Sequence, residues 1–159
     1  MSQKSVDISL DPIELIQTHF QGLYSGELGL SSIKGGQNAA NIALENLDIT
    51  RYAEQRSEVA PLDKRGATVL SPYIRHNLLT LSQVYTAVKG APFKDREKFR
   101  DELYWQEYAR HLYARLGTRL FENLRYEANR DTQGDGWNRD MHCIDLTMTE
   151  LENDGWLVN

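Results

Sequence analysis

The sequence predicts an all-α fold, a globular domain of several helices, and three observations favour this class. Apolar residues recur at the three- and four-residue spacing of buried helix faces through most of the chain. Two helix starts combine a capping residue with a proline, Asp11-Pro12 and Ser71-Pro72. No hairpin pattern, internal repeat or low-complexity tract is evident, and the expected helices differ in length, which favours globular packing over a symmetric bundle.

Two helices are expected in the first third of the chain. The first begins at Asp11-Pro12 and ends by Gly26, because glycine readily stops a helix. The second is expected over residues 38–55. Its buried stripe is expected to contain Ala39, Ile42, Ala43 and Leu47, with Tyr52 as a further candidate.

The middle of the chain is expected to hold an irregular connection over 56–67 and two short helices. The first of these starts at Ser71-Pro72. The second follows Thr80-Leu81-Ser82-Gln83, a capping-box pattern, and closes at Gly90.

The strongest helix prediction covers residues 95–116 and ends before Gly117. A shorter helix is expected over 118–127, a polar loop over 128–139, and a last helix over 140–153 that Gly155 ends. The residues of this last helix expected to face inward are Met141, Ile144, Met148 and Leu151.

Composition bounds the class of protein. The chain has 159 residues and a formal net charge of -5, which suits one domain and argues against a simple basic nucleic-acid-binding module. The lone cysteine, Cys143, fits a reducing compartment, and no apolar run is long enough to span a bilayer. We therefore expect a cytoplasmic protein without disulfides or membrane spans. His142 and Cys143 are neighbours on a helix, which gives no metal signature.

The segment ATVLSP at 67–72 is the first candidate site. It places two hydroxyls and a run of backbone N–H groups at a helix start, where a phosphate can bind. The alternative is plain capping of the helix by Ser71.

The helix 99–112 is the second candidate. Phe99, Glu102, Trp105 and Gln106 share neighbouring helical positions, so their side chains can offer a planar heterocycle a stacking surface and a hydrogen-bond acceptor. The alternative is a core stripe with one paired glutamate.

In their order, these segments resemble the C-terminal, FAD-binding helical domain of the DNA photolyase and cryptochrome family. ATVLSPYIR at 67–75 is similar to the family's Thr-Ser-x-Leu-Ser-Pro-x-Leu-x motif, and ELYWQEY at 102–108 to Glu-Leu-x-Trp-Arg-Glu-Phe. The Gly35-Gly36 pair, YAEQR at 52–56 and the spacing from Asp145 to Asn159 follow other family segments.

The resemblance implies an FAD cofactor and a set of site residues. Those implied to bind the cofactor are Tyr52, Thr68, Val69, Leu70, Ser71, Phe99 and Gln106. Those implied to face a flipped-out pyrimidine dimer are Glu102, Trp105 and Asn159. In photolyases, light-excited reduced flavin supplies the electron that splits the dimer, while the protein positions the cofactor.

The sequence also departs from the family pattern. Ala67 replaces the first threonine of the phosphate motif, Gln106 replaces the usual arginine, and Val158 stands where many members have histidine. Loss of a charged hydrogen bond, worth about 1.5–3 kcal/mol, would weaken FAD binding. The family's light-harvesting α/β domain has no counterpart here.

The resemblance divides the chain into an N-terminal helix and lead-in, 1–34, and a partial FAD-binding domain, 35–159, incomplete at its C-terminus. The apolar Trp156 and Leu157 close to the end of the chain either pack back onto the last helix or mark a cut inside a larger domain. A partner chain or further segment would then complete the flavin pocket.

Three functions remain open. The first is a photolyase-like protein whose parent activity is light-driven repair of cyclobutane pyrimidine dimers in DNA. The second is a non-repair flavoprotein such as a cryptochrome-like sensor, and the third is a helical protein without cofactor. Contact with DNA is a separate question. The basic residues that suggest it are Lys94, Arg96, Lys98, Arg100, Arg110, Arg115, Arg119 and Arg125, and interleaved acids favour an ion-paired face equally.

Overall fold

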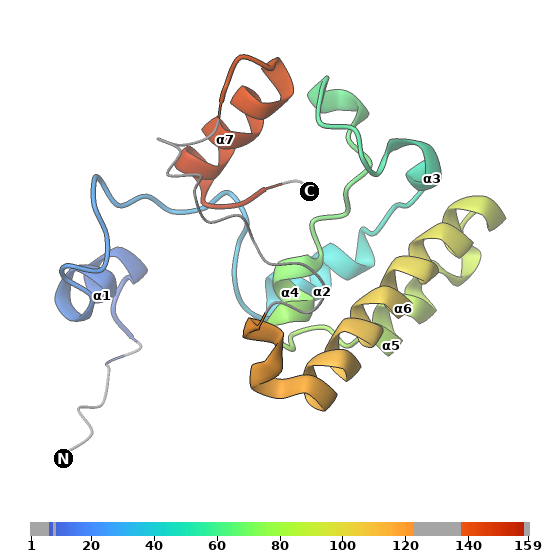
Figure 1. Ribbon diagram of the computed structural model, residues 1–159, viewed down its shortest axis with the longest axis horizontal. Coiled ribbons are helices and arrows are strands. Elements are labelled where there is room, and N and C mark those ends of the chain that lie inside the picture. Colours follow the sequence, from blue (N-terminus) through green and yellow to red (C-terminus); the bar gives the residue numbers. More distant parts are fainter. Residues whose placement is uncertain (1–6, 8, 123–137, 158–159) are drawn as a thin grey trace.

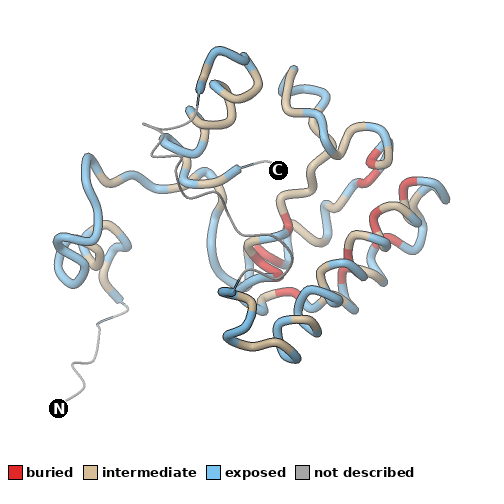
Figure 2. The backbone as a smooth tube through the Cα atoms, in the orientation of Figure 1, coloured by how far each residue is buried: buried red, intermediate tan, exposed pale blue. Residues whose placement is uncertain are grey.

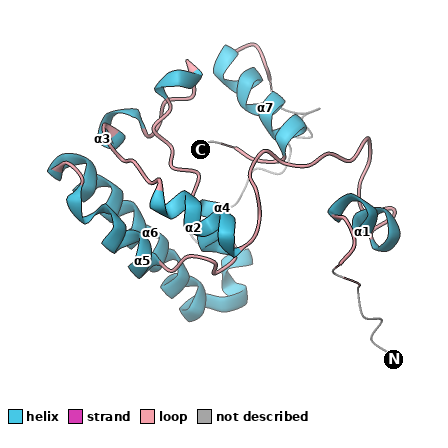
Figure 3. Ribbon diagram, turned by 180° about the vertical axis from the view of Figure 1, so that it is seen from behind, coloured by secondary structure: helices cyan, strands magenta, loops and turns pink. Residues whose placement is uncertain are grey.

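The computed structural model describes residues 7, 9–122 and 138–157, and these residues form helices and loops without a β-strand (Figures 1 and 3). The α-helices are α1 (Pro12–His19), α2 (Gln37–Glu45), α3 (Tyr52–Gln55), α4 (Ser71–Arg75), α5 (Leu81–Ala87), α6 (Phe93–Leu116) and α7 (His142–Asp154). Three 3₁₀ turns accompany them: η1 (Leu62–Lys64), η2 (Val88–Gly90) and η3 (Gly117–Phe121). The all-α prediction is confirmed for the described residues.

The hydrophobic core lies where α2 to α6 meet (Figure 2). α5 and α6 lie side by side, and the short α3 packs across α6. The buried apolar residues are Ala40, Ile49, Tyr52, Leu70, Tyr73, Ile74, Leu79, Val84, Val88, Phe99 and Leu103. α1 and α7 contribute no buried residue, and α1 lies apart from the other helices.

Local capping fixes several helix ends as expected. The Asp11 side chain accepts a hydrogen bond from the N–H of Ile13, and Pro12 takes the first helical position. Thr80 and Gln83 form a complete capping box at the start of α5. Gly155, in the left-handed conformation, ends α7. α1 ends at His19, earlier than Gly26.

The prediction of one helix over 38–55 is wrong, because the helical conformation is interrupted between α2 and α3. Asn46 caps α2 by donating its side-chain amide to the carbonyl of Ile42, and the Asp48 carboxylate accepts the N–H of Thr50. Such side chains compete with helical hydrogen bonds. Arg51 then adopts a left-handed φ of 64°. Ile42, expected in the buried stripe, is 58% exposed, and Ala40 is buried instead.

Three further expectations need correction. Leu70, not Ser71, is the N-cap of α4, so Ser71 is already inside the helix. Met141 precedes α7 as its N-cap and is 64% exposed, so it does not face inward. The helix expected over 118–127 begins as the 3₁₀ turn η3, and its remainder lies outside the described residues. No helix within the described ranges is long and apolar enough to cross a membrane.

Candidate functional site

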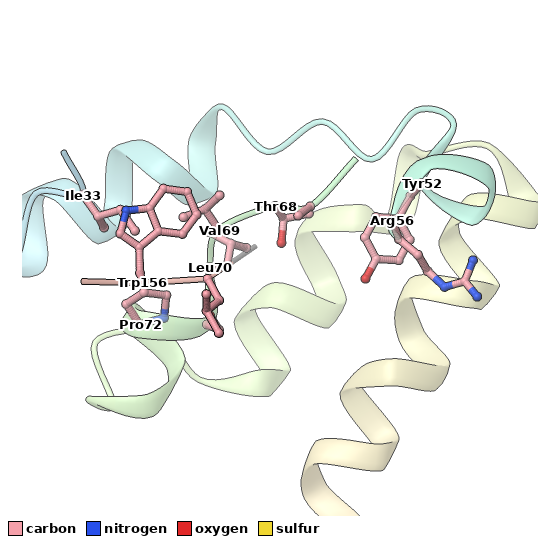
Figure 4. A pocket seen from close by; sticks show the side chains of 11 residues that line it. Ile33, Tyr52, Arg56, Thr68, Val69, Leu70, Pro72 and Trp156 are labelled. Carbon is pink, nitrogen blue, oxygen red and sulfur yellow. The ribbon is translucent and has the colours of Figure 1, made fainter. Parts of the chain in front are cut away.

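A cavity of about 380 Å³ lies between α3, the segment 67–72 and the residues that follow α7 (Figure 4). Its wall residues are Ile33, Tyr52, Arg56, Ala67, Thr68, Val69, Leu70, Ser71, Pro72, Trp156 and Leu157. This volume is at the lower end of the range of about 300–1,000 Å³ typical of small-molecule sites. We call it the α3–α4 cavity.

The backbone of one cavity wall is held in an unusual conformation. Val69 has a φ of 55°, which is costly for a β-branched residue, and Leu70 follows in the right-handed region. Adjacent residues of opposite hand turn consecutive N–H groups toward one concave side, an arrangement that binds anions. Within the described residues, the N–H groups of Thr68, Val69 and Leu70 donate no hydrogen bond. The wall therefore has donors available for a phosphate.

The hydroxyl of Ser71 does not cap α4, whose N-cap Leu70 has no side-chain capping bond. The capping alternative for Ser71 is therefore wrong. α4 has only five residues, so its dipole is small. The donors of the wall depend on the backbone turn at Val69 more than on the helix.

Two wall residues from the α3 side of the cavity, Tyr52 and Arg56, belong to a network of charged side chains. The Tyr52 phenol donates a hydrogen bond to Glu102 Oε2, and Arg56 Nε lies 2.9 Å from Glu102 Oε1. Lys98 Nζ lies 3.6 Å from the same oxygen. Burial, followed by the hydrogen bond to Glu102, raises the pKa of Tyr52 far above its ordinary value, so the phenol stays protonated.

Asp95 positions α3 from the neighbouring helix. It is 8% exposed, and its carboxylate oxygens accept the N–H groups of Arg51 (3.1 Å) and Ala53 (2.8 Å). Because those N–H groups lie at the start of α3, Asp95 acts as its cap from α6. Phe99, one turn further along α6, packs edge-on against the Tyr52 ring at 5.0 Å.

The opposite wall comes from the end of α7. Trp156 lies against the cavity near Ile33 and Pro72 (Figure 4). Its indole N–H is buried and has no partner among the described residues. An ion pair joins this part of the chain to the rest: Arg65 Nη1 lies 2.7 Å from Glu150 Oε1, and both side chains are largely buried.

The structure brings together five of the seven residues expected to bind a cofactor. Tyr52, Thr68, Val69, Leu70 and Ser71 all line the α3–α4 cavity.

The other two expected cofactor residues lie elsewhere. Phe99 is in the core beneath Tyr52 and does not line the cavity. Gln106 lines a neighbouring hollow of about 430 Å³, which shares Ser71 with the first cavity. That hollow also contains two guanidinium groups, from Arg75 and Arg110.

The residues expected to face a substrate are dispersed. Glu102 does not line the cavity, and its carboxylate is engaged by two residues that do, Tyr52 and Arg56. The Trp105 side chain is 60% exposed, with Lys98 Nζ 4.3 Å from its ring centroid. Asn159 lies outside the described residues.

Four wall residues were not singled out from the sequence as ligand contacts: Ile33, Arg56, Trp156 and Leu157. The four-residue spacing of Tyr52 and Arg56, the C-cap of α3, could have indicated Arg56, because such residues share a helix face. Ile33 and Trp156 reach the cavity through tertiary packing, for which the sequence offers no local signal.

Comparison with known proteins adds no identification. No protein-family model matches this chain, and neither the curated proteins nor the solved structures searched contain a significant match.

Proposed function

We propose that this chain binds FAD as part of a helical domain of the photolyase and cryptochrome type. The observation that carries the proposal is the meeting of Tyr52, Thr68, Val69, Leu70 and Ser71 around one cavity. The motif resemblance selected these residues, and the fold places them on one concave surface from two separate segments.

The residues fit the chemistry of a flavin dinucleotide. The unpaired N–H groups of 68–70 and the Ser71 hydroxyl suit a diphosphate, and the rings of Tyr52 and Trp156 suit flat heterocycles. Bound FAD would supply redox and light-driven electron-transfer chemistry. The chain's own residues would hold the phosphates, orient the rings and exclude water.

The cavity is small for a whole dinucleotide, so a second surface is needed. The hollow containing Gln106, Arg75 and Arg110 shares Ser71 and offers positive charge beside the first cavity. A further segment or a partner chain would complete the pocket.

The parent activity we propose is flavin-dependent repair of cyclobutane pyrimidine dimers in DNA. One observation favours the non-repair flavoprotein as the second candidate. The Glu102 carboxylate, expected to face the dimer, is held by Tyr52, Arg56 and Lys98. Light-dependent repair of an oligonucleotide that carries a dimer, assayed with the FAD-loaded chain, separates the two candidates.

FAD binding is tested by reconstituting the purified chain with FAD and recording its absorption spectrum and a binding isotherm. We expect flavin bands, and an affinity that falls about tenfold or more in the double variant Thr68→Ala, Ser71→Ala, because hydrogen bonds to charged groups contribute about 1.5–3 kcal/mol. The control is Ser82→Ala, an exposed serine on α5. A folded chain that binds no FAD, or equal affinities for the double variant and the control, contradicts the proposal.

A further inference from the structure

α6 has two opposite faces with different partners. Asp95, Phe99 and Leu103 are buried against the core. On the other side, Tyr104 and Tyr108 are 57% and 65% exposed, and most of the second half of the helix is exposed as well (Figure 2). α6 lies beside α5 at the edge of the described part of the chain (Figures 1 and 3), and the residues of this outer face are exposed within that part.

The outer face carries a regular pattern. Six exposed residues follow one another at alternating spacings of four and three, which is the spacing of a coiled-coil seam. They are Glu97, Asp101, Tyr104, Tyr108, His111 and Arg115. We call this set the α6 seam. Its first two residues are acidic, its centre is aromatic and its last residue is a guanidinium.

We propose that the α6 seam is the interface of an antiparallel homodimer. Two seams packed antiparallel about their centre place Glu97 opposite Arg115 of the second copy, and Tyr104 opposite Tyr108. Asp101 then lies opposite His111, and the twofold axis repeats each pair. Parallel packing would instead place Glu97 against Glu97 and Arg115 against Arg115. The seam is therefore complementary in charge to a second copy of itself, but only when the two helices run antiparallel.

A groove at the centre of the seam can accommodate an aromatic ring of the second copy. A groove of about 390 Å³ beside Tyr104 is lined by Leu81, Ser82, Tyr85, Leu103 and Tyr104 itself. In the antiparallel register, Tyr108 of the second copy meets this groove. The Tyr104 phenol donates a hydrogen bond of 3.2 Å to Tyr85, which holds the groove wall in place before association.

The groups at the acidic end remain available to a partner. Glu97 makes only long contacts of 3.4 Å to Arg96 and 3.7 Å to Arg100, and its side chain is 50% exposed. One contact would weaken the dimer. Glu107, on the flank of the seam, lies opposite Glu107 of the second copy across the twofold axis, and the two carboxylates repel each other. The α6 seam shares no residue with the α3–α4 cavity, so this inference does not depend on FAD binding.

The test is sedimentation equilibrium of the full chain and two charge-reversal variants, with circular dichroism to verify folding. We expect a wild-type dimer. Arg115→Glu and Glu97→Arg each place like charges opposite one another twice, and each should weaken the dimer about tenfold or more. An equimolar mixture of the two variants should restore dimers, because the arginine introduced at position 97 of one chain then meets the glutamate introduced at position 115 of the other. Lys64→Glu, an exposed site on η1, is the control with the same charge change as Arg115→Glu.

The outcomes separate the possible occupants. A wild-type chain that stays monomeric at the highest attainable concentration overturns the proposal and leaves the seam to another protein or segment. A dimer that both reversals leave unchanged either is parallel, because each reversed residue then faces a like charge before and after the change, or uses another surface; both cases overturn the proposal. Tighter association of Glu107→Gln supports the register, because that change removes the single like-charge contact.

Discussion

Tyr52 connects the core, the cavity and a charged network through one side chain. Its ring is buried against Phe99, its edge lines the α3–α4 cavity, and its phenol donates to Glu102. The same carboxylate pairs with Arg56. A change at Tyr52 therefore affects stability through both packing and electrostatics, and the two effects can be separated by pH.

At the residue scale, we predict that Tyr52→Phe destabilises the chain by about 1.5–3 kcal/mol at neutral pH, because a hydrogen bond to a charged group is lost. The folded-state pKa of Tyr52 is raised above its ordinary value of 10.0, so its contribution is complete below that pH. The contribution is lost as pH rises above that value, because the unfolded chain then releases the proton more readily than the folded one.

Urea unfolding across the alkaline range measures this prediction. The difference in the free energy of unfolding between wild type and Tyr52→Phe should shrink as pH rises past the ordinary tyrosine value. Tyr113→Phe, which removes a phenol from a side chain that is 61% exposed, is the control for general alkaline effects. The absence of any difference, at neutral or alkaline pH, would show that Tyr52 contributes through ring packing alone, because phenylalanine keeps the ring.

At the scale of elements, α3 shows how a very short helix is kept in place. Four residues are far too few for a stable isolated helix. Asp95 accepts the N–H groups of Arg51 and Ala53 at its start, and the Gly66 N–H donates to the carbonyl of Gln55 at its end. A Cβ at position 66 would lie 2.8 Å from the Cβ of Gln55, so only glycine allows this approach.

We predict that Asp95→Ala destabilises the chain by about 2–3 kcal/mol, because it leaves two N–H groups at the start of α3 without an acceptor. Asp95→Asn, which keeps one acceptor oxygen, should cost less. Chemical denaturation compares both variants with Asp63→Ala, a change at an exposed carboxylate on η1. Equal stabilities of Asp95→Ala and Asp63→Ala would mean that α3 does not need its cap from α6.

Elements whose ends are fixed by local interactions are the ones that the sequence predicts well. The capping box of Thr80 and Gln83 and the glycine stop at Gly155 are local, and both are present as expected. The end of α2 is set locally by Asn46, but the start of α3 at Tyr52 is not, because it depends on Asp95, more than forty residues away. The segment 67–72 of the cavity wall carries a local motif, whereas the contribution of Trp156 depends on where α7 packs.

At the scale of the whole molecule, α7 is only weakly joined to the core. It buries no residue, yet the segment that follows it supplies the Trp156 wall of the cavity. One contact of α7 with a segment distant in sequence is the Arg65–Glu150 ion pair, supported by the bond from Arg65 Nε to the carbonyl of Val59. Elements with few buried contacts open at low free energy, so cavity closure depends on this pair.

We therefore predict that Glu150→Ala loosens α7 without unfolding the core. The amides of α7 should exchange with solvent about ten to a hundred times faster, because a charged hydrogen bond worth about 1.5–3 kcal/mol is lost, whereas those of α5 and α6 keep their rates. Hydrogen exchange measured by mass spectrometry tests both parts. The matched control is Glu152→Ala on the same helix, whose 58% exposed side chain pairs with Arg139, itself partly exposed. If both variants accelerate α7 equally, the Arg65–Glu150 pair is not what holds α7 in place. If α5 and α6 accelerate with α7, then α7 is not an independent unit and the cavity opens only when the whole core unfolds.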